Sequence, residues 1–222
     1  MAVHPPTRAA SVITVHHLNH SRSQRVLWLL EELGMEYDIV HYQRDPATNL
    51  APPELKAIHP LGKSPVIVDD TLVLAETGAI VEYLVRKYGD GSLAPAPDIG
   101  SRDYLDYLHW MHFAEGSAMV PLLLKLYVAR LGAAGEPLWP RIESELHNHF
   151  SYMSAALGDR DWFVGNRFSA ADVQLSFVIE AGAMRGPLAE YRNLVRFRDR
   201  FESRPAFRRA LERGGPYKFA RS

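Results

Sequence analysis

Residues 61–84, LGKSPVIVDDTLVLAETGAIVEYL, hold the pattern that decides the fold. A tight turn over 62–64 leads into Pro65, and two short aliphatic runs follow, at 66–68 and 72–74. An acidic turn joins the two runs, which predicts a β-hairpin. From residue 75 onward the apolar residues fall three to four positions apart, which predicts a helix that follows the hairpin directly.

The same stretch carries groups suited to a small ligand with amide and carboxylate groups. A cis bond at Ser64–Pro65 would turn the Ser64 backbone N–H and C=O outward, although only about one X–Pro bond in twenty is cis, which favours trans. Glu76 and Thr77 stand where the helix begins, and the unpaired N–H groups there favour a carboxylate. A plain hairpin followed by a capped helix would show the same pattern, so a purely structural role stays open.

The segments before this stretch predict a mixed sheet. A strand over 12–16, a helix from about Ser23 to a stop at Gly34, and a strand over 37–42 form a β-α-β unit. A short helix over 52–59 then leads to the hairpin and helix. A parallel crossover followed by an antiparallel hairpin gives a mixed sheet with helices on its faces.

A proline- and glycine-rich stretch at 89–100 marks the boundary between two predicted domains, 12–89 and 100–222. Beyond it the pattern is helical, with helices over 101–131, 139–157, 194–203 and 205–213. Pro121 is expected to kink or divide the first of them. Ser169 and Asp172 form a capping box before another apolar helix.

Composition narrows the class of protein. The chain has 222 residues, no cysteine and a net charge of −1, which excludes disulfides and a protein thiol nucleophile and gives no reason to expect nucleic acid. No apolar run reaches the length of a membrane span, and the first eleven residues look like a disordered tail rather than a signal peptide. These features predict a soluble, cytoplasmic protein without a transmembrane segment.

The motifs together resemble the cytosolic glutathione transferases over almost the whole chain. The segments SRSQRVLWLLEELG (21–34) and APPELKAIHPLGKSP (51–65) are most similar to the bacterial and fungal branch typified by the yeast membrane-associated enzyme. GNRFSAADV (165–173) matches a family motif whose role is folding. The resemblance implies an α/β thioredoxin-like domain with a four-stranded mixed sheet, followed by an all-helical domain. It also implies a detoxifying homodimer that uses glutathione as co-substrate and no metal.

The resemblance assigns glutathione contacts to the opening stretch. In the family a cis proline stands at the position of Pro65, and the residue before it, here Ser64, pairs with the cysteinyl backbone. Lys63 is the expected contact to the glycyl part, and Glu76 with Thr77 are those to the γ-glutamyl part. A solvated turn residue is the alternative for Lys63.

The residue that stabilises the glutathione thiolate is expected in the loop 19–23. Counted back from Arg25, Ser21 takes the place of the serine in theta- and delta-like enzymes, whereas the tau- and zeta-like serine would fall on His20. Asn19, His20 and Arg22 remain rivals to Ser21. Ser21 could also be only a loop or cap residue, although Ser23 is better placed by sequence to cap the helix.

The electrophile site is expected on the first helices of the second domain, where His112, Glu115 and Met119 fall about one turn apart. An ordinary packing face is the alternative for all three. His109 and His112 lack a metal-binding motif, so no metal is expected. The predicted function is attack of the thiolate on small hydrophobic electrophiles or peroxides. Alternatives are a glutathione-dependent isomerase, dehalogenase or disulfide reductase, and a non-catalytic glutathione-binding or assembly module.

Overall fold

The computed structural model describes residues 12–221, and the tail expected at 1–11 lies outside the described residues. The first half of the chain forms a four-stranded sheet with three helices. In order these elements are β1 (Ile13–Leu18), α1 (Ser23–Glu32), β2 (Tyr37–Tyr42), α2 (Leu55–Ile58), β3 (Val66–Asp69), β4 (Leu72–Ala75) and α3 (Thr77–Lys87). The strand order is β2-β1-β3-β4. Only β1 and β2 are parallel, so the predicted mixed sheet is confirmed.

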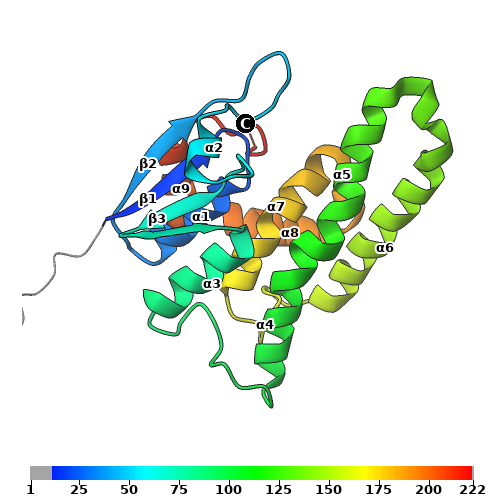
Figure 1. Cartoon of the computed structure of the whole chain (residues 1–222). Coiled ribbons are helices and arrows are strands. Elements are labelled where there is room, and N and C mark those ends of the chain that lie inside the picture. Colours follow the sequence, from blue (N-terminus) through cyan, green and yellow to red (C-terminus); the bar gives the residue numbers. More distant parts are fainter. Residues whose placement is uncertain (1–11, 222) are drawn as a thin grey trace, which may run out of the picture.

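The second half contains helices and, among the described residues, no strand. In chain order the helices are α4 (Arg102–Phe113), η1 (Ala114–Ala118), α5 (Met119–Val128), η2 (Ala129–Leu138), α6 (Trp139–Leu157), α7 (Ala170–Arg185), η3 (Leu188–Glu190), α8 (Arg192–Glu202) and α9 (Pro205–Gly214). Figure 1 shows the sheet on one side of the molecule and the helical half on the other. This is a thioredoxin-like domain followed by a helical domain, as predicted. The exact limits 12–89 and 100–222 remain a prediction.

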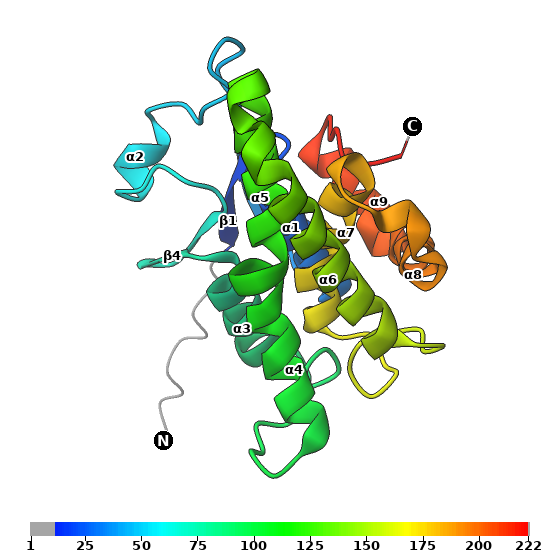
Figure 2. The ribbon, with the colours of Figure 1, turned by 90° about the vertical axis from the view of Figure 1, so that its right-hand side faces the viewer.

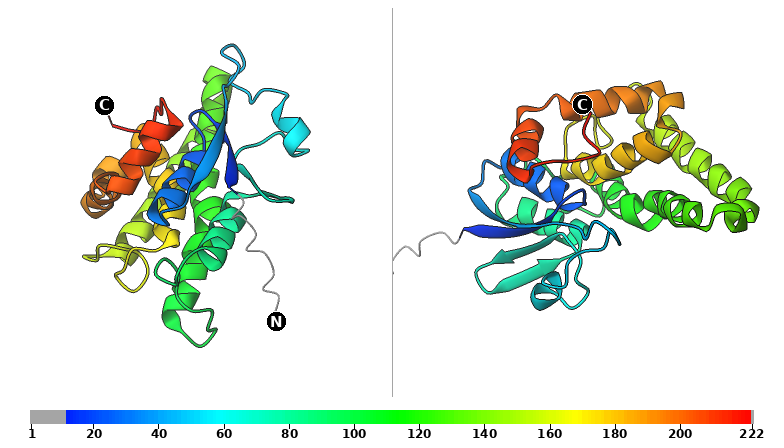
Figure 3. Two further views of the ribbon diagram at one scale, coloured as in Figure 1. Left: turned by 90° about the vertical axis from the view of Figure 1, so that its left-hand side faces the viewer. Right: turned by 90° about the horizontal axis from the view of Figure 1, so that it is seen from above.

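Helix α1 lies at the junction of the two halves. It packs against β1 and α3 of its own half, and against α7 and α9 of the other. Residues 23–30 are therefore buried all round, and Trp28 packs against Phe201 and Phe207 with ring centroids 5.6 Å and 5.2 Å apart. In Figure 3, α9 and α2 lie on opposite sides of the sheet. Helices α8 and α9 thus complete the core around α1.

The helix expected over 101–131 is divided, but the break precedes Pro121. A π-helical turn, η1, separates α4 from α5, and Pro121 lies in the first turn of α5. Proline has no N–H for the carbonyl four residues earlier, and the wider turn accommodates that loss. Figure 2 shows α4 and α5 following one another along α6.

The expectation that no segment could span a membrane needs one correction. The helical run Arg102–Leu157 contains a window of 18 residues with a mean hydropathy of 1.4, long and apolar enough to cross a bilayer. Core helices of soluble proteins meet the same criterion, so this is weak evidence for a span. Helix α5, which is part of this run, packs against α6 and α7.

The helix caps show one wrong prediction and one confirmed one. Ser23 is not the cap of α1, because the cap position is Arg22 and Ser23 is already helical. The Ser169–Asp172 capping box of α7 is present as predicted. Asp172 also accepts the Phe163 N–H at 3.0 Å, which ties the preceding loop to the helix.

Candidate functional site

Two adjoining cavities open where β1, the turn before β3 and the start of α3 meet η1 and α5. The first, of about 250 Å³, is lined by Thr77 and is called the Thr77 cavity here. The second, of about 230 Å³, is lined by Ser21 and is called the Ser21 cavity. Arg22, Lys63 and Ser64 line both. Every residue that the family resemblance assigned to glutathione lines one or both cavities.

The turn before β3 presents a free backbone to the Thr77 cavity. The Ser64–Pro65 bond is cis, as the family resemblance implied and contrary to the general frequency of X–Pro bonds. The Ser64 hydroxyl donates to the His16 carbonyl at 2.8 Å and accepts the Leu18 N–H at 3.2 Å. Among residues 12–221, no hydrogen bond outside the strands uses the Ser64 N–H or C=O. The side chain therefore fixes the turn while the backbone groups stay available.

Glu76 begins α3 in a backbone conformation that is rare for any residue other than glycine. Its φ of 71° and ψ of 115° lie in the left-handed half of conformational space. Such residues cost about 1–3 kcal/mol and cluster at ligand sites. The Glu76 side chain is exposed and Thr77 is buried, and both line the Thr77 cavity. The first N–H groups of α3 and the positive end of its dipole make this corner suitable for a carboxylate.

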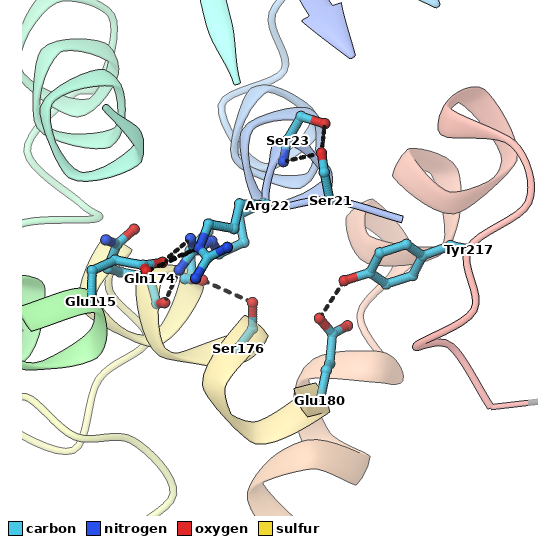
Figure 4. A network of polar contacts seen from close by, with 10 residues as sticks. Ser21, Arg22, Ser23, Glu115, Gln174, Ser176, Glu180 and Tyr217 are labelled. Atoms are coloured by element: carbon cyan, nitrogen blue, oxygen red, sulfur yellow. Dashed lines mark hydrogen bonds and ion pairs between the residues drawn. The ribbon is translucent and has the colours of Figure 1, made fainter. Parts of the chain in front are cut away.

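Ser21 is buried in a short chain of polar contacts. Its Oγ lies 2.7 Å from the Ser23 Oγ and accepts the Ser23 N–H at 3.2 Å. The Ser23 Oγ lies 2.9 Å from His17 Nδ1. Burial, with His41 close by, lowers the pKa of His17 to about 4, so His17 is neutral at pH 7 and can accept through Nδ1. Figure 4 shows Ser21 and Ser23 together at the start of α1.

These contacts give Ser21 part of the structural role that the sequence assigned to Ser23, because its Oγ accepts a helix-start N–H. His17 was missed by sequence reasoning. The only signal for it was its place within the first strand, two residues before the loop that carries Ser21.

Glu115 joins the two halves of the molecule through two arginines. Its carboxylate accepts from Arg22 Nε at 2.8 Å and 2.9 Å and from Arg25 Nη2 at 2.5 Å (Figure 4). Burial alone would raise the pKa of Glu115, but the two arginines outweigh it and lower the pKa to about 2. Arg25 is fully buried and also donates to the Gln174 carbonyl at 2.5 Å. Glu115 is therefore ionised at any physiological pH.

The three electrophile-site candidates separate in space. Met119 lines the Ser21 cavity, and Glu115 lines the Thr77 cavity instead. His112 is exposed and lines neither cavity. Among residues 12–221, no three His, Cys, Asp or Glu side chains are grouped to hold a metal ion.

The rivals of Ser21 also differ in position. Asn19 lines neither cavity, and its Oδ1 accepts the Arg44 N–H at 2.9 Å. His20 lines the Ser21 cavity, where its Nδ1 accepts the Lys218 N–H at 3.1 Å. Arg22 lines both cavities but is held by Glu115. Ser21, His20 and Arg22 thus remain candidates by position.

Comparison with known proteins follows the two halves of the chain. The family described as "Glutathione S-transferase, N-terminal domain" matches residues 10–86, and "Glutathione S-transferase, C-terminal domain" matches residues 118–205. Glutathione S-transferase 3 of Schizosaccharomyces pombe is 36% identical over 218 residues, covering 91% of this chain and 88% of that protein.

Solved structures agree with the sequence matches. A glutathione S-transferase from Actinobacillus pleuropneumoniae superposes with a TM-score of 0.85 at 34% identity, covering 95% of this chain and 97% of that one. A glutathione transferase family member from Pseudomonas fluorescens, solved with two glutathione bound, has a TM-score of 0.75 at 26% identity. That match covers 93% of this chain and 95% of the other.

Proposed function

This chain belongs to the glutathione S-transferase family, and on that premise we propose that it is an enzyme that activates glutathione for attack on small electrophiles or peroxides. The observation that carries the proposal is the pair of adjoining cavities that share Arg22, Lys63 and Ser64. One suits the peptide part of glutathione, and the other places Ser21 beside space for a second reactant. Within the superfamily we assign the chain to the bacterial and fungal branch that resembles the yeast membrane-associated enzyme.

Glutathione would lie along the Thr77 cavity with its sulfur toward Ser21. The γ-glutamyl carboxylate would meet the first N–H groups of α3 and the Thr77 hydroxyl, and its ammonium would meet the Glu76 carboxylate. The cysteinyl backbone would pair with the Ser64 N–H and C=O. Lys63, exposed at the rim, would meet the glycyl carboxylate. Each charged end of the tripeptide thereby finds an opposite charge or a helix terminus.

The chemical step needs the thiolate rather than the thiol. A cysteine thiol with a pKa near 8.5 is only a few per cent ionised at neutral pH. A hydroxyl that donates to the sulfur favours the charged form, and the start of α1 adds positive potential. Ser21 is in position for this role, provided that its proton turns from Ser23 to the sulfur. The thiolate then attacks an electrophile held in the Ser21 cavity.

Two alternatives use the same site. A glutathione-dependent isomerase, dehalogenase or disulfide reductase would differ only in the second reactant, and a substrate panel at saturating glutathione separates these activities. A non-catalytic binding or assembly module would bind glutathione without turnover. Ser21 in the wall of the second cavity favours an enzyme over such a module.

Glutathione binding provides the direct test of the proposed site. We expect a glutathione affinity column to retain the protein, and Glu76→Ala to weaken binding about tenfold or more, because the ammonium loses a charge-assisted partner. Calorimetry measures this loss. Glu36→Ala, which removes an exposed carboxylate outside both cavities, serves as the control. Equal affinities for Glu76→Ala and wild type would show that the γ-glutamyl group binds elsewhere.

We also propose that the protein is a cytoplasmic homodimer. The family commonly dimerises, and helices α3 and α4 are the elements expected to meet their counterparts across a two-fold axis. Light scattering at micromolar concentration should give about twice the 25.0 kDa mass of one chain. A mass near that of a single chain would contradict the proposal.

A further inference from the structure

The wall of the Ser21 cavity is strongly basic. It contains no Asp or Glu, and its cationic side chains are Arg22, Arg44, Lys63, Arg130, Arg185 and Lys218. The whole chain has 25 basic and 26 acidic residues, so this local excess is not a reflection of composition. The cations come from the N-cap of α1, the loops before α2 and β3, η2, the end of α7 and the C-terminal segment.

Four of these cations have only neutral partners. Arg44 donates to the Asn19 and Asn49 carbonyls at 3.2 Å and 3.1 Å. Arg185 and Lys218 lie against one aromatic ring, that of Phe219, at 5.8 Å and 5.4 Å from its centroid.

The fourth cation, Arg130, lies 5.9 Å from the centroid of the Tyr127 ring. Within residues 12–221, no ion pair includes any of the four. Their charges therefore remain available to a ligand.

The cations also repel one another across the cavity. Burial, and then the neighbouring charge of Arg22, lowers the pKa of Arg44 and of Arg185. Burial, and then Arg44 and Arg185, lowers the pKa of Lys218 in the same way. An anion placed among them would remove this repulsion and replace it with attraction.

The rest of the wall is apolar. Met119, Leu123, Leu126 and Phe177 line the cavity beside the cations. A volume of about 230 Å³ admits a small aromatic or branched body. The cavity thus combines an apolar surface with an unpaired positive rim, next to the hydroxyl of Ser21.

We propose that the second substrate of this enzyme is an organic electrophile that carries a carboxylate. This inference rests on the proposed function and refines its general hydrophobic electrophile. The apolar body lies against Leu123 and Met119, and the carboxylate lies among Arg44, Arg185 and Lys218. For an aryl chloride, the thiolate sulfur forms a bond to the ring carbon and chloride leaves with the electron pair of the carbon–chlorine bond. The thiol proton goes to solvent.

A matched pair of electrophiles tests the charge preference. The probes are 4-chloro-3-nitrobenzoate and 4-chloro-3-nitrobenzamide, each compared by kcat/KM divided by its uncatalysed rate with glutathione. We expect the wild type to favour the carboxylate by about tenfold or more, and the preference to fall as salt is raised. Arg44→Gln, Arg185→Gln and Lys218→Gln should each reduce the preference about three- to tenfold. Arg196→Gln, on the exposed face of α8, is the matched control and should leave it unchanged.

Equal rates for both electrophiles, or a preference that the three variants leave intact, would overturn the proposal. If neither electrophile reacts, calorimetry compares the two glutathione conjugates that the reactions would form. Tighter binding of the carboxylate conjugate, lost in Lys218→Gln, supports the charged acceptor site, and equal binding overturns it. If neither conjugate nor glutathione itself binds, the proposed function is wrong and the acceptor proposal falls with it.

Discussion

Ser21→Ala is expected to raise the pKa of the bound glutathione thiol by about one to two units and to slow conjugation at neutral pH roughly ten- to hundredfold. A charge-assisted hydrogen bond is worth about 1.5–3 kcal/mol, and one pKa unit corresponds to about 1.4 kcal/mol. The affinity for glutathione should change less, because the contacts proposed for the charged ends and backbone of the tripeptide come from other residues. The pH profile of conjugation measures both the shift and the rate.

The structure supplies the control for this variant. Ser21→Ala also removes the acceptor of the Ser23 N–H, which is expected to cost about 1 kcal/mol of stability. Ser23→Ala breaks the same Ser21–Ser23 contact and the contact to His17 but keeps the Ser21 hydroxyl. A pH profile shifted by Ser21→Ala and not by Ser23→Ala therefore reports the hydroxyl itself rather than the fold of the loop.

Alanine variants of the three neighbouring residues show which group stabilises the thiolate if Ser21 does not. An unchanged profile for Ser21→Ala together with a shift for His20→Ala, Arg22→Ala or Asn19→Ala would transfer the role to that neighbour. Unchanged profiles in all four would assign thiolate stabilisation to backbone N–H groups and the dipole of α1.

The fold could be predicted wherever local pattern and tertiary context agree. The hairpin over 66–75 follows from two short aliphatic runs joined by an acidic turn, the helix after it follows from a helical period, and the capping box fixes the start of α7. Pro121 does divide the expected helix, but the sequence does not show that the division takes the form of a π-helical turn just before it. Ser23 was taken as a cap because sequence cannot show that Ser21 accepts its N–H.

The site could be predicted only where its residues are contiguous. Lys63 to Pro65 and Glu76 with Thr77 fall in one short stretch, so a motif contains them. The cations of the Ser21 cavity come from segments as far apart in sequence as Arg22 and Lys218, and no pattern within any one of them indicates a shared cavity. Glu115 was expected at the second-substrate site because its spacing from Met119 is helical, whereas Arg22 and Arg25 hold it beside the Thr77 cavity.

The same ion cluster gives the largest expected effect on stability. Glu115→Gln removes the only carboxylate that pairs with Arg25 among the described residues and leaves a fully buried guanidinium without a counter-charge. Removal of one partner of a buried ion pair lowers the free energy of unfolding by about 3–5 kcal/mol. Glu115 is partly exposed, so we expect a loss of about 3 kcal/mol in the free energy of unfolding at pH 7. For a chain of this length that lowers Tm by about 6–12 °C. Glu143→Gln, which breaks a surface pair with Lys125, should cost less than about 1 kcal/mol.

The pH dependence distinguishes the charge of Glu115 from its packing. The pKa of Glu115 is lowered to about 2 from a usual 4.5, so the folded state binds its proton less readily than the unfolded chain does. The stability that its charge contributes is fully present above pH 4.5 and is lost as the pH falls toward 2. Wild type and Glu115→Gln should therefore differ most near neutral pH, differ about half as much at about pH 3, and converge only near pH 2, where the folded-state carboxylate becomes protonated. A difference in Tm that stays constant from pH 7 to about pH 3 would show that the amide disturbs packing, and that the ion pair does not hold α1 against η1.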